Sequence, residues 1–317
     1  MSNLPLVSVV MSVYNDEKFV SQSIKSILDQ SFSNFEFIIV DDGSNDSSKK
    51  IIKDWERFDS RIIFIDRSTN MGLPFSLNEA LSIAKGKYIA RMDSDDIATM
   101  SRFEKQLRFL EAKPEVDIVG GQVCHIDSVG IQSDSMAQPI SFKEIKSIAE
   151  FACPINHPTY MAKKKAYVLL EGYREEFFYA QDYDFILRAI DHKLVIENMP
   201  DILLRYRFLP RETSAVKVHR QLYLGRLAIV LHKQRVKTGS ESADTFEMAK
   251  RTSFYAGVLF SYSWELRRKS LELKLPIYIG YILAFVSSIL HYEVFYDSVR
   301  GLRLKVIRLI DSKFKLR

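Results

Sequence analysis

The stretch that decides the fold is Phe35-Glu36-Phe37-Ile38-Ile39-Val40-Asp41-Asp42-Gly43-Ser44, at residues 35–44. Its first six residues are mostly apolar and include Val and Ile, which is typical of a buried strand, and the run stops abruptly at turn residues. Residues 47–55 then have apolar side chains at helical spacing. A buried strand that ends in a polar turn and leads into a helix predicts one unit of an α/β sheet.

The same alternation extends in both directions over the first hundred residues. Further strands are predicted at 7–13, 61–65 and 87–92, and further helices at 20–28 and 76–84. Strands that alternate with helices predict βαβ units, and therefore a mostly parallel sheet with helices on both faces. The pattern is more irregular from about residue 101 to 213, and from residue 221 onward it predicts helices.

The composition fits a globular protein of the cytosol. The chain has 317 residues, of which 47% are hydrophobic and 27% are charged, so a large core needs no disulfides. Two cysteines, Cys124 and Cys153, indicate a reducing compartment rather than a secreted disulfide framework. Residues 1–5 lack the basic and apolar regions of a signal peptide, so we expect none.

Polar turns follow three of the predicted strands: Tyr14-Asn15, Asp41-Asp42 and Asp93 to Asp96. Open α/β sheets bind ligands at the carboxyl ends of their strands, so we expect these turns on one edge. Aspartate oxygens suit Mg²⁺ or Mn²⁺, and a tyrosine ring can stack on a base. Each turn also has a structural explanation: a solvated helix cap at 93–96, an Asx-turn at 41–42 and a packed ring at Tyr14.

An Asp-x-Asp spacing occurs twice, at 93–95 and at 182–184. About one such spacing is expected by chance, so the spacing alone is a weak signal. The first pair lies in the turn after a predicted strand, whereas the second begins a predicted helix. Asp184 lies about 200° around that helix from Asp182, so the two carboxylates point in different directions. The chain contains no glycine-rich dinucleotide or P-loop motif and no Cys/His cluster for zinc.

Taken in order, the motifs closely resemble those of the family 2 glycosyltransferases, bacterial enzymes of the GT-A fold that build capsules, exopolysaccharides and O-antigens. The resemblance is dense through Asp96, thinner to about Arg211 and absent from the C-terminal third. The motifs that carry it are residues 7–15, residues 23–30, residues 35–44, Asn70-Met71-Gly72 with Asn78, residues 86–90, residues 93–96 and residues 181–184.

The resemblance implies a role for six residues. Ser12 and Tyr14 would line the nucleobase pocket, Asp42 would bind uracil, Asp93 would lie near the ribose, Asp95 would ligate Mg²⁺ or Mn²⁺, and Asp182 would be the catalytic base. Two residues depart from the family pattern. Ser12 stands where many members have Pro, and Gln181 stands where a Glu usually precedes the catalytic Asp.

The resemblance also implies the reaction. We expect a GT-A type α/β fold whose residues 1–98 bind the nucleotide-sugar and whose residues 99–215 bind the acceptor, followed by a helical region at 216–317. The enzyme would be a metal-dependent, inverting hexosyl- or N-acetylhexosaminyltransferase that moves a sugar from a UDP-sugar to a hydroxyl of a glycan acceptor, which we expect to be lipid-linked. A nucleotidyltransferase and a non-catalytic subunit of a polysaccharide assembly complex are the alternatives.

The C-terminal region predicts contact with a membrane. Residues 275–292 contain no Asp, Glu, Lys or Arg, and residues 300–317 combine seven Lys or Arg residues with one acid, Asp311. Apolar residues at helical spacing with basic neighbours are typical of a helix that lies on anionic lipid. We therefore expect the enzyme at the cytoplasmic face of the inner or plasma membrane, with no nucleic-acid partner. Alternatively, both segments pack as ordinary helices or form a homo-oligomer interface.

Overall fold

The computed structural model describes residues 4–133, 137–208, 215–241 and 246–247. The chain divides into two compact units, Met1–Pro210 and Arg211–Arg317. Helix α8 (Ala215–Thr238) belongs to the second unit. The predicted segments at 275–292 and 300–317 lie outside the described residues. No helix in the described part of the chain is long and apolar enough to cross a membrane.

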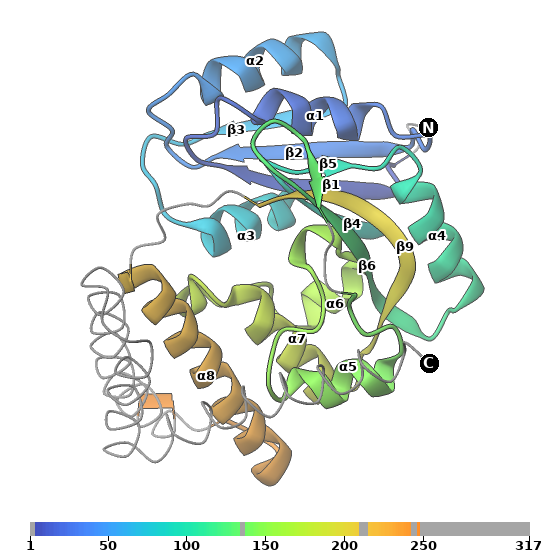
Figure 1. Ribbon diagram of the computed structural model, residues 1–317, viewed down its shortest axis with the longest axis vertical. Coiled ribbons are helices and arrows are strands. Elements are labelled where there is room, and N and C mark those ends of the chain that lie inside the picture. Colours follow the sequence, from blue (N-terminus) through green and yellow to red (C-terminus); the bar gives the residue numbers. More distant parts are fainter. Residues whose placement is uncertain (1–3, 134–136, 209–214, 242–245, 248–317) are drawn as a thin grey trace, which may run out of the picture. The chain divides into compact units, whose positions relative to one another are not determined.

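The first unit is built on a sheet of nine strands in the order β3-β2-β1-β4-β8-β6-β9-β5, with β7 paired to β6 (Figure 1). The strands are β1 (Val7–Val13), β2 (Phe35–Asp41), β3 (Ile62–Asp66), β4 (Tyr88–Asp93), β5 (Ile97–Ala98), β6 (Val116–Ile126), β7 (Gln132–Ser133), β8 (Met161–Lys163) and β9 (Val195–Arg207). The helices are α1 (Val20–Leu28), α2 (Ser48–Phe58), α3 (Leu73–Ile83), α4 (Arg102–Ala112), α5 (Phe142–Ala149), α6 (Lys164–Leu169) and α7 (Gln181–Asp191), with short 3-10 helices η1 (His157–Thr159) and η2 (Glu175–Phe177).

The predicted α/β fold with a mostly parallel sheet is confirmed. Strand β1 and helix α1 have the predicted bounds, β2 ends one residue later than predicted, and β3 and β4 each begin and end one residue later than predicted. Helix α3 begins at Leu73, so the predicted start at Ser76 was wrong. The reason is Pro74, which occupies the first turn, where its fixed φ is favourable and its missing N–H costs nothing.

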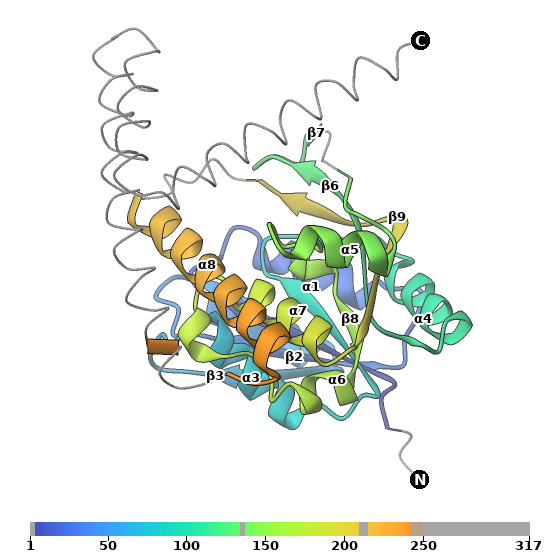
Figure 2. The ribbon, with the colours of Figure 1, turned by 90° about the horizontal axis from the view of Figure 1, so that it is seen from below.

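Both faces of the parallel part of the sheet are covered. Val9, Met11 and Phe37 pack in one core with Ile24 and Ile27 of α1. The strand residues between them are also fully buried, and α3 contacts β1 and β2. Helices α1 and α2 lie on one side of β1, β2 and β3, whereas α3 lies on the other (Figure 1). In the view from below, α5 and α7 lie in front of the sheet and α1 lies behind it (Figure 2).

The sheet curls, so that β9 ends beside the turn that follows β4. Strand β5 follows β4 by four residues along the chain, but it pairs with β9 at the far end of the strand order. Strand β9 is parallel to the long strand β6, and β8 joins β6 to β4 in antiparallel fashion. The end of β9, at Arg207, is therefore brought to the turn that follows β4.

The register of the central strands aligns the predicted turns. Ser12 of β1 is opposite Val40 of β2 and Asp93 of β4, and Val13 is opposite Asp41. All three strands run parallel and end at the same level. The prediction that the polar turns share one edge of the sheet is therefore confirmed.

Candidate active site

The turn after β1 carries the residues predicted to line a base pocket. Ser12 is half-buried, and the side chain of Tyr14 is 48% exposed at the end of the strand. The neighbouring Asn15 has a positive φ of 51°, which Asn tolerates better than most residues. Its Oδ1 accepts the N–H of Asn45 over 2.8 Å, so the turns after β1 and β2 are held together. The exposed Tyr14 ring is available for stacking at this edge.

The carboxylate of Asp42 is hydrogen-bonded to a neighbouring loop. The side chain is 2% exposed, and its two oxygens accept the N–H groups of Met71 (2.9 Å) and Gly72 (2.8 Å). Arg67 forms an ion pair with the same carboxylate at 3.2 Å. Asp42 therefore fixes residues 67–72 beside the sheet edge, and direct binding of a base by its oxygens stays a prediction. Asp41 accepts the N–H of Ser44 over 3.1 Å, as the turn interpretation predicted.

The turn after β4 gathers three carboxylates. One oxygen of each of Asp93, Asp95 and Asp96 lies within 4.8 Å of the others. Asp96 is 1% exposed, and its Oδ2 has no hydrogen-bond partner among the described residues. Burial, with the charges of Asp93 and Asp95, raises the pKa of Asp96 well above its ordinary value. Crowded carboxylates with an unused buried oxygen are a donor set that fits a hard divalent cation.

Contacts from several elements fix this acidic turn. Arg207 donates from its main-chain N–H to Asp96 Oδ1 and from Nε to the Asp95 carbonyl, each over 2.8 Å. Ser94 Oγ donates to Asp16 Oδ2 over 2.6 Å, which ties the turn to the one after β1. The guanidinium of Arg91, which is 2% exposed, pairs with Asp93. Sequence reasoning missed Arg91 and Arg207, and it gave Asp96 no role of its own.

Asp182 lies at the start of α7 and is half-buried. Its Oδ1 accepts the N–H of Tyr183 over 2.8 Å, and Cys153 Sγ lies 3.9 Å from Oδ2. Burial raises the pKa of Asp182 above its ordinary value, with the Tyr183 N–H and Arg91 acting in the opposite direction and Asp93 adding to the rise.

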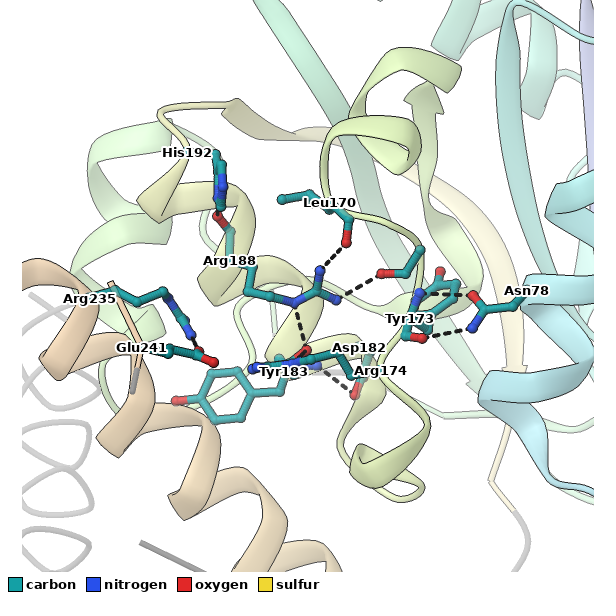
Figure 3. Close-up of polar contacts among 12 residues, drawn as sticks. Asn78, Leu170, Tyr173, Arg174, Asp182, Tyr183, Arg188, His192, Arg235 and Glu241 are labelled. Atoms are coloured by element: carbon teal, nitrogen blue, oxygen red, sulfur yellow. Dashed lines mark hydrogen bonds and ion pairs between the residues drawn. The ribbon is translucent and has the colours of Figure 1, made fainter. Parts of the chain in front are cut away.

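Asp184 has a different environment, as its position on the helix predicted. It is fully buried, and its carboxylate is paired with Arg174 and, at 2.8 Å, with Arg188. Arg188 also donates to the carbonyls of Leu170 and Gly172 (Figure 3). Asp184 therefore holds α7 against the loop at 170–174, with its carboxylate paired to two arginines.

A buried aromatic cluster lies near Arg91. His157 Nε2 and the Tyr173 hydroxyl are 2.8 Å apart, and the Tyr167 and Tyr173 hydroxyls are 3.2 Å apart. Burial, followed by the charge of Arg91, holds the pKa of His157 well below its ordinary value. His157 is therefore a buried residue whose ring is hydrogen-bonded within the protein.

Comparison with known proteins gives a consistent picture. The model of glycosyl transferase family 2 matches residues 8–169. An uncharacterised glycosyltransferase of Methanocaldococcus jannaschii is 37% identical over 236 residues, which cover 74% of this chain and 81% of that protein. The amylovoran biosynthesis glycosyltransferase AmsE of Erwinia amylovora is 30% identical over 233 residues, covering 71% of this chain and 86% of AmsE.

Two solved structures share the fold at low sequence identity. Staphylococcus aureus TarS 1–349, in complex with UDP-GlcNAc, has a TM-score of 0.59 and 18% identity, covering 86% of this chain and 76% of that chain. The mannosyltransferase PcManGT of Pyrobaculum calidifontis, in complex with GDP-Man and Mn²⁺, has a TM-score of 0.56 and 14% identity, covering 96% and 81%. At these identities the likeness extends to the GT-A fold.

Proposed function

The chain belongs to glycosyltransferase family 2, and from this we propose that it transfers a hexosyl or N-acetylhexosaminyl group from a UDP-sugar to a hydroxyl of a glycan acceptor, with inversion at the anomeric carbon. One observation carries the proposal. The carboxylates of Asp93, Asp95 and Asp96 converge in the turn that follows β4, at the edge of the sheet where β1 and β2 also end. This edge therefore carries a group of oxygens that suits a cation, where open α/β sheets bind their ligands.

The donor side is formed by the edge of the parallel strands. Tyr14 and Ser12 line the base pocket. Asp42 borders this pocket and holds the adjacent loop at 67–72 in place. Asp93 lies near the ribose, and Asp95 is the principal ligand of Mg²⁺ or Mn²⁺, with Asp96 as the neighbouring oxygen donor. A divalent cation bound there supplies positive charge that stabilises the diphosphate leaving group. The complex of PcManGT with Mn²⁺ supports this choice of cofactor.

Asp182 performs the acid–base step. It takes the proton from the acceptor hydroxyl as that oxygen forms a bond to the anomeric carbon. The bond from the same carbon to the phosphate oxygen breaks, and the nucleoside diphosphate leaves with the electron pair. A raised pKa suits this role, because a general base works best when its pKa is near the working pH.

The biological setting is part of the proposal. The name of AmsE, an amylovoran biosynthesis glycosyltransferase, supports a role in cell-surface polysaccharide synthesis for this chain. We place the enzyme at the cytoplasmic face of the membrane, where the C-terminal region contacts anionic lipid and the acceptor is lipid-linked. A homo-oligomer built through the same region is the alternative use of those residues.

Calorimetry with nucleotides tests the donor site. UDP should bind in the presence of Mn²⁺, and binding should collapse in chelator and in Asp95→Ala. GDP should bind much more weakly than UDP. Equal binding of UDP and GDP, unaffected by chelator, would contradict the proposed donor site. In a turnover assay, release of pyrophosphate in place of UDP would indicate nucleotidyl transfer, and release of neither would indicate a non-catalytic subunit.

A further inference from the structure

Asn78 is a family motif residue to which the donor site gives no role. It lies on α3, and its side chain bonds to the main chain of Tyr173, 95 residues later. Nδ2 donates to the Tyr173 carbonyl over 2.7 Å, and Oδ1 accepts the Tyr173 N–H over 2.9 Å. Figure 3 shows this pair of bonds. The main-chain N–H and C=O of Tyr173 are therefore both hydrogen-bonded to the Asn78 side chain, as they would be to a neighbouring strand.

The Tyr173 loop is in turn bound to the helix of the proposed base. Arg174, the next residue, pairs with Asp184, and Arg188 bonds to the Gly172 carbonyl over 2.8 Å. Gly172 has a φ of +70°, and a Cβ on it would lie 2.5 Å from Asn78 Oδ1, so the loop passes tightly over Asn78. Asp184 is two residues from Asp182 on α7. The loop thus connects Asn78 to the helix turn that carries Asp182.

The N-terminal end of α3 is bound to the donor side. The helix begins after Gly72, whose N–H donates to Asp42 Oδ2 over 2.8 Å. Arg67, which pairs with Asp42, also donates to Ser76 Oγ of α3 over 3.3 Å. Helix α3 therefore contacts two loops. The loop at 67–72 borders the proposed base pocket, and the loop at 172–174 is bonded to α7.

We infer that Asn78 is a positioning residue, which sets the place of the Asp182 carboxylate relative to the bound donor by tying the loop at 172–174 to α3. The inference rests on the proposed role of Asp182. Asn78 acts through the main chain and touches no reacting atom. Attack on the anomeric carbon is sensitive to placement, since a displacement of about 1 Å can cost roughly 10²-fold in rate.

Three variants test the inference: Asn78→Ala, Asn78→Asp and the control Ser82→Ala, which changes an exposed residue of the same helix. Asn78→Asp keeps an acceptor for the Tyr173 N–H and loses the donor to its carbonyl. Transfer kcat, UDP affinity and melting temperature are measured for each, with Asp182→Asn alongside. We expect kcat to fall about tenfold or more in Asn78→Ala and less in Asn78→Asp, with UDP affinity within about twofold of wild type and no change in Ser82→Ala.

Any other result contradicts either the positioning role of Asn78 or the assignment of Asp182 as the base. A kcat within twofold of wild type in Asn78→Ala overturns the positioning role. So does a loss of UDP affinity that matches the loss of kcat, or the failure of both Asn78 variants to fold, because these outcomes indicate general support of the fold. Near wild-type transfer by Asp182→Asn overturns the proposed base itself, and with it the inference that Asn78 positions that base.

Discussion

Arg207 donates its main-chain N–H to the carboxylate of Asp96 over 2.8 Å, across 111 residues of sequence. Its guanidinium also bonds to the carbonyls of Asp95 and Asp127, each over 2.8 Å. The last residue of β9 is therefore one of the residues that fix the turn that follows β4. The oxygens of this turn are the candidate cation ligands, so the hydrogen bonds of Arg207 help to hold these ligands in place.

We predict that Arg207→Met weakens cation-dependent UDP binding about 10- to 100-fold, the usual cost of losing a residue that orients metal ligands. Methionine keeps apolar contact but cannot bond to the Asp95 carbonyl. Calorimetry with UDP and Mn²⁺ provides the measurement. Arg205→Met changes an exposed arginine of the same strand and should bind UDP as wild type does. Equal affinities of the two variants would show that the turn holds its shape without Arg207.

Asp184→Asn should destabilise the protein by about 3–5 kcal/mol, because it leaves Arg174 and Arg188 without their buried counter-charge. Denaturant unfolding measures this loss. Asp29→Asn is the matched control, since Asp29 forms an exposed pair with Lys25 that should contribute less than about 1 kcal/mol. A free energy of unfolding unchanged by Asp184→Asn would refute the structural role of this carboxylate.

The transfer rate should fall in acid with a midpoint above the ordinary range of an aspartate. Asp182 accepts a proton only as the carboxylate, and burial raises its pKa, so the active form is lost as the pH falls through that raised value. A profile of kcat against pH at saturating substrates reports this limb. A limb at an ordinary aspartate pKa would contradict the environment described for Asp182.

The full-length enzyme should co-sediment with anionic liposomes, much less with neutral ones, and should partly detach at high salt. Residues 300–317 are rich in Lys and Arg, and each contributes about 1 kcal/mol near an anionic surface at low ionic strength. A chain that ends after Lys274 should remain in solution and still bind UDP. If the full-length protein ignores anionic liposomes at low salt, the C-terminal region is structural or oligomeric.

Local pattern predicted the parts of the site that follow strands. Val7–Val13 and Phe35–Asp41 are short apolar runs that end in turns, and parallel pairing then aligns Tyr14, Asp42 and Asp93 without further information. Helical geometry likewise separated Asp182 from Asp184. The strand bounds follow from neighbours in the sequence, and the shared edge follows from the parallel pairing that such strands adopt.

The supporting contacts depend on tertiary structure and could not be predicted from pattern. Arg207 reaches Asp96 only because the sheet curls and brings β9 to β5. Asn78 was visible as a motif residue, but its partner Tyr173 lies in the irregular half, where no periodicity predicts the path of the loop. The burial of Asp96, with one oxygen unpartnered among the described residues, is a tertiary property that the sequence of an acidic turn does not reveal.

The most direct test of the account is the rate of sugar transfer by Asp182→Asn, measured together with its affinity for UDP. Asparagine keeps the size of the side chain and removes its basicity. The account predicts that transfer falls by about 10²-fold or more while UDP affinity and melting temperature stay close to those of the wild type. Transfer near the wild-type rate would contradict the assignment of Asp182 as the general base.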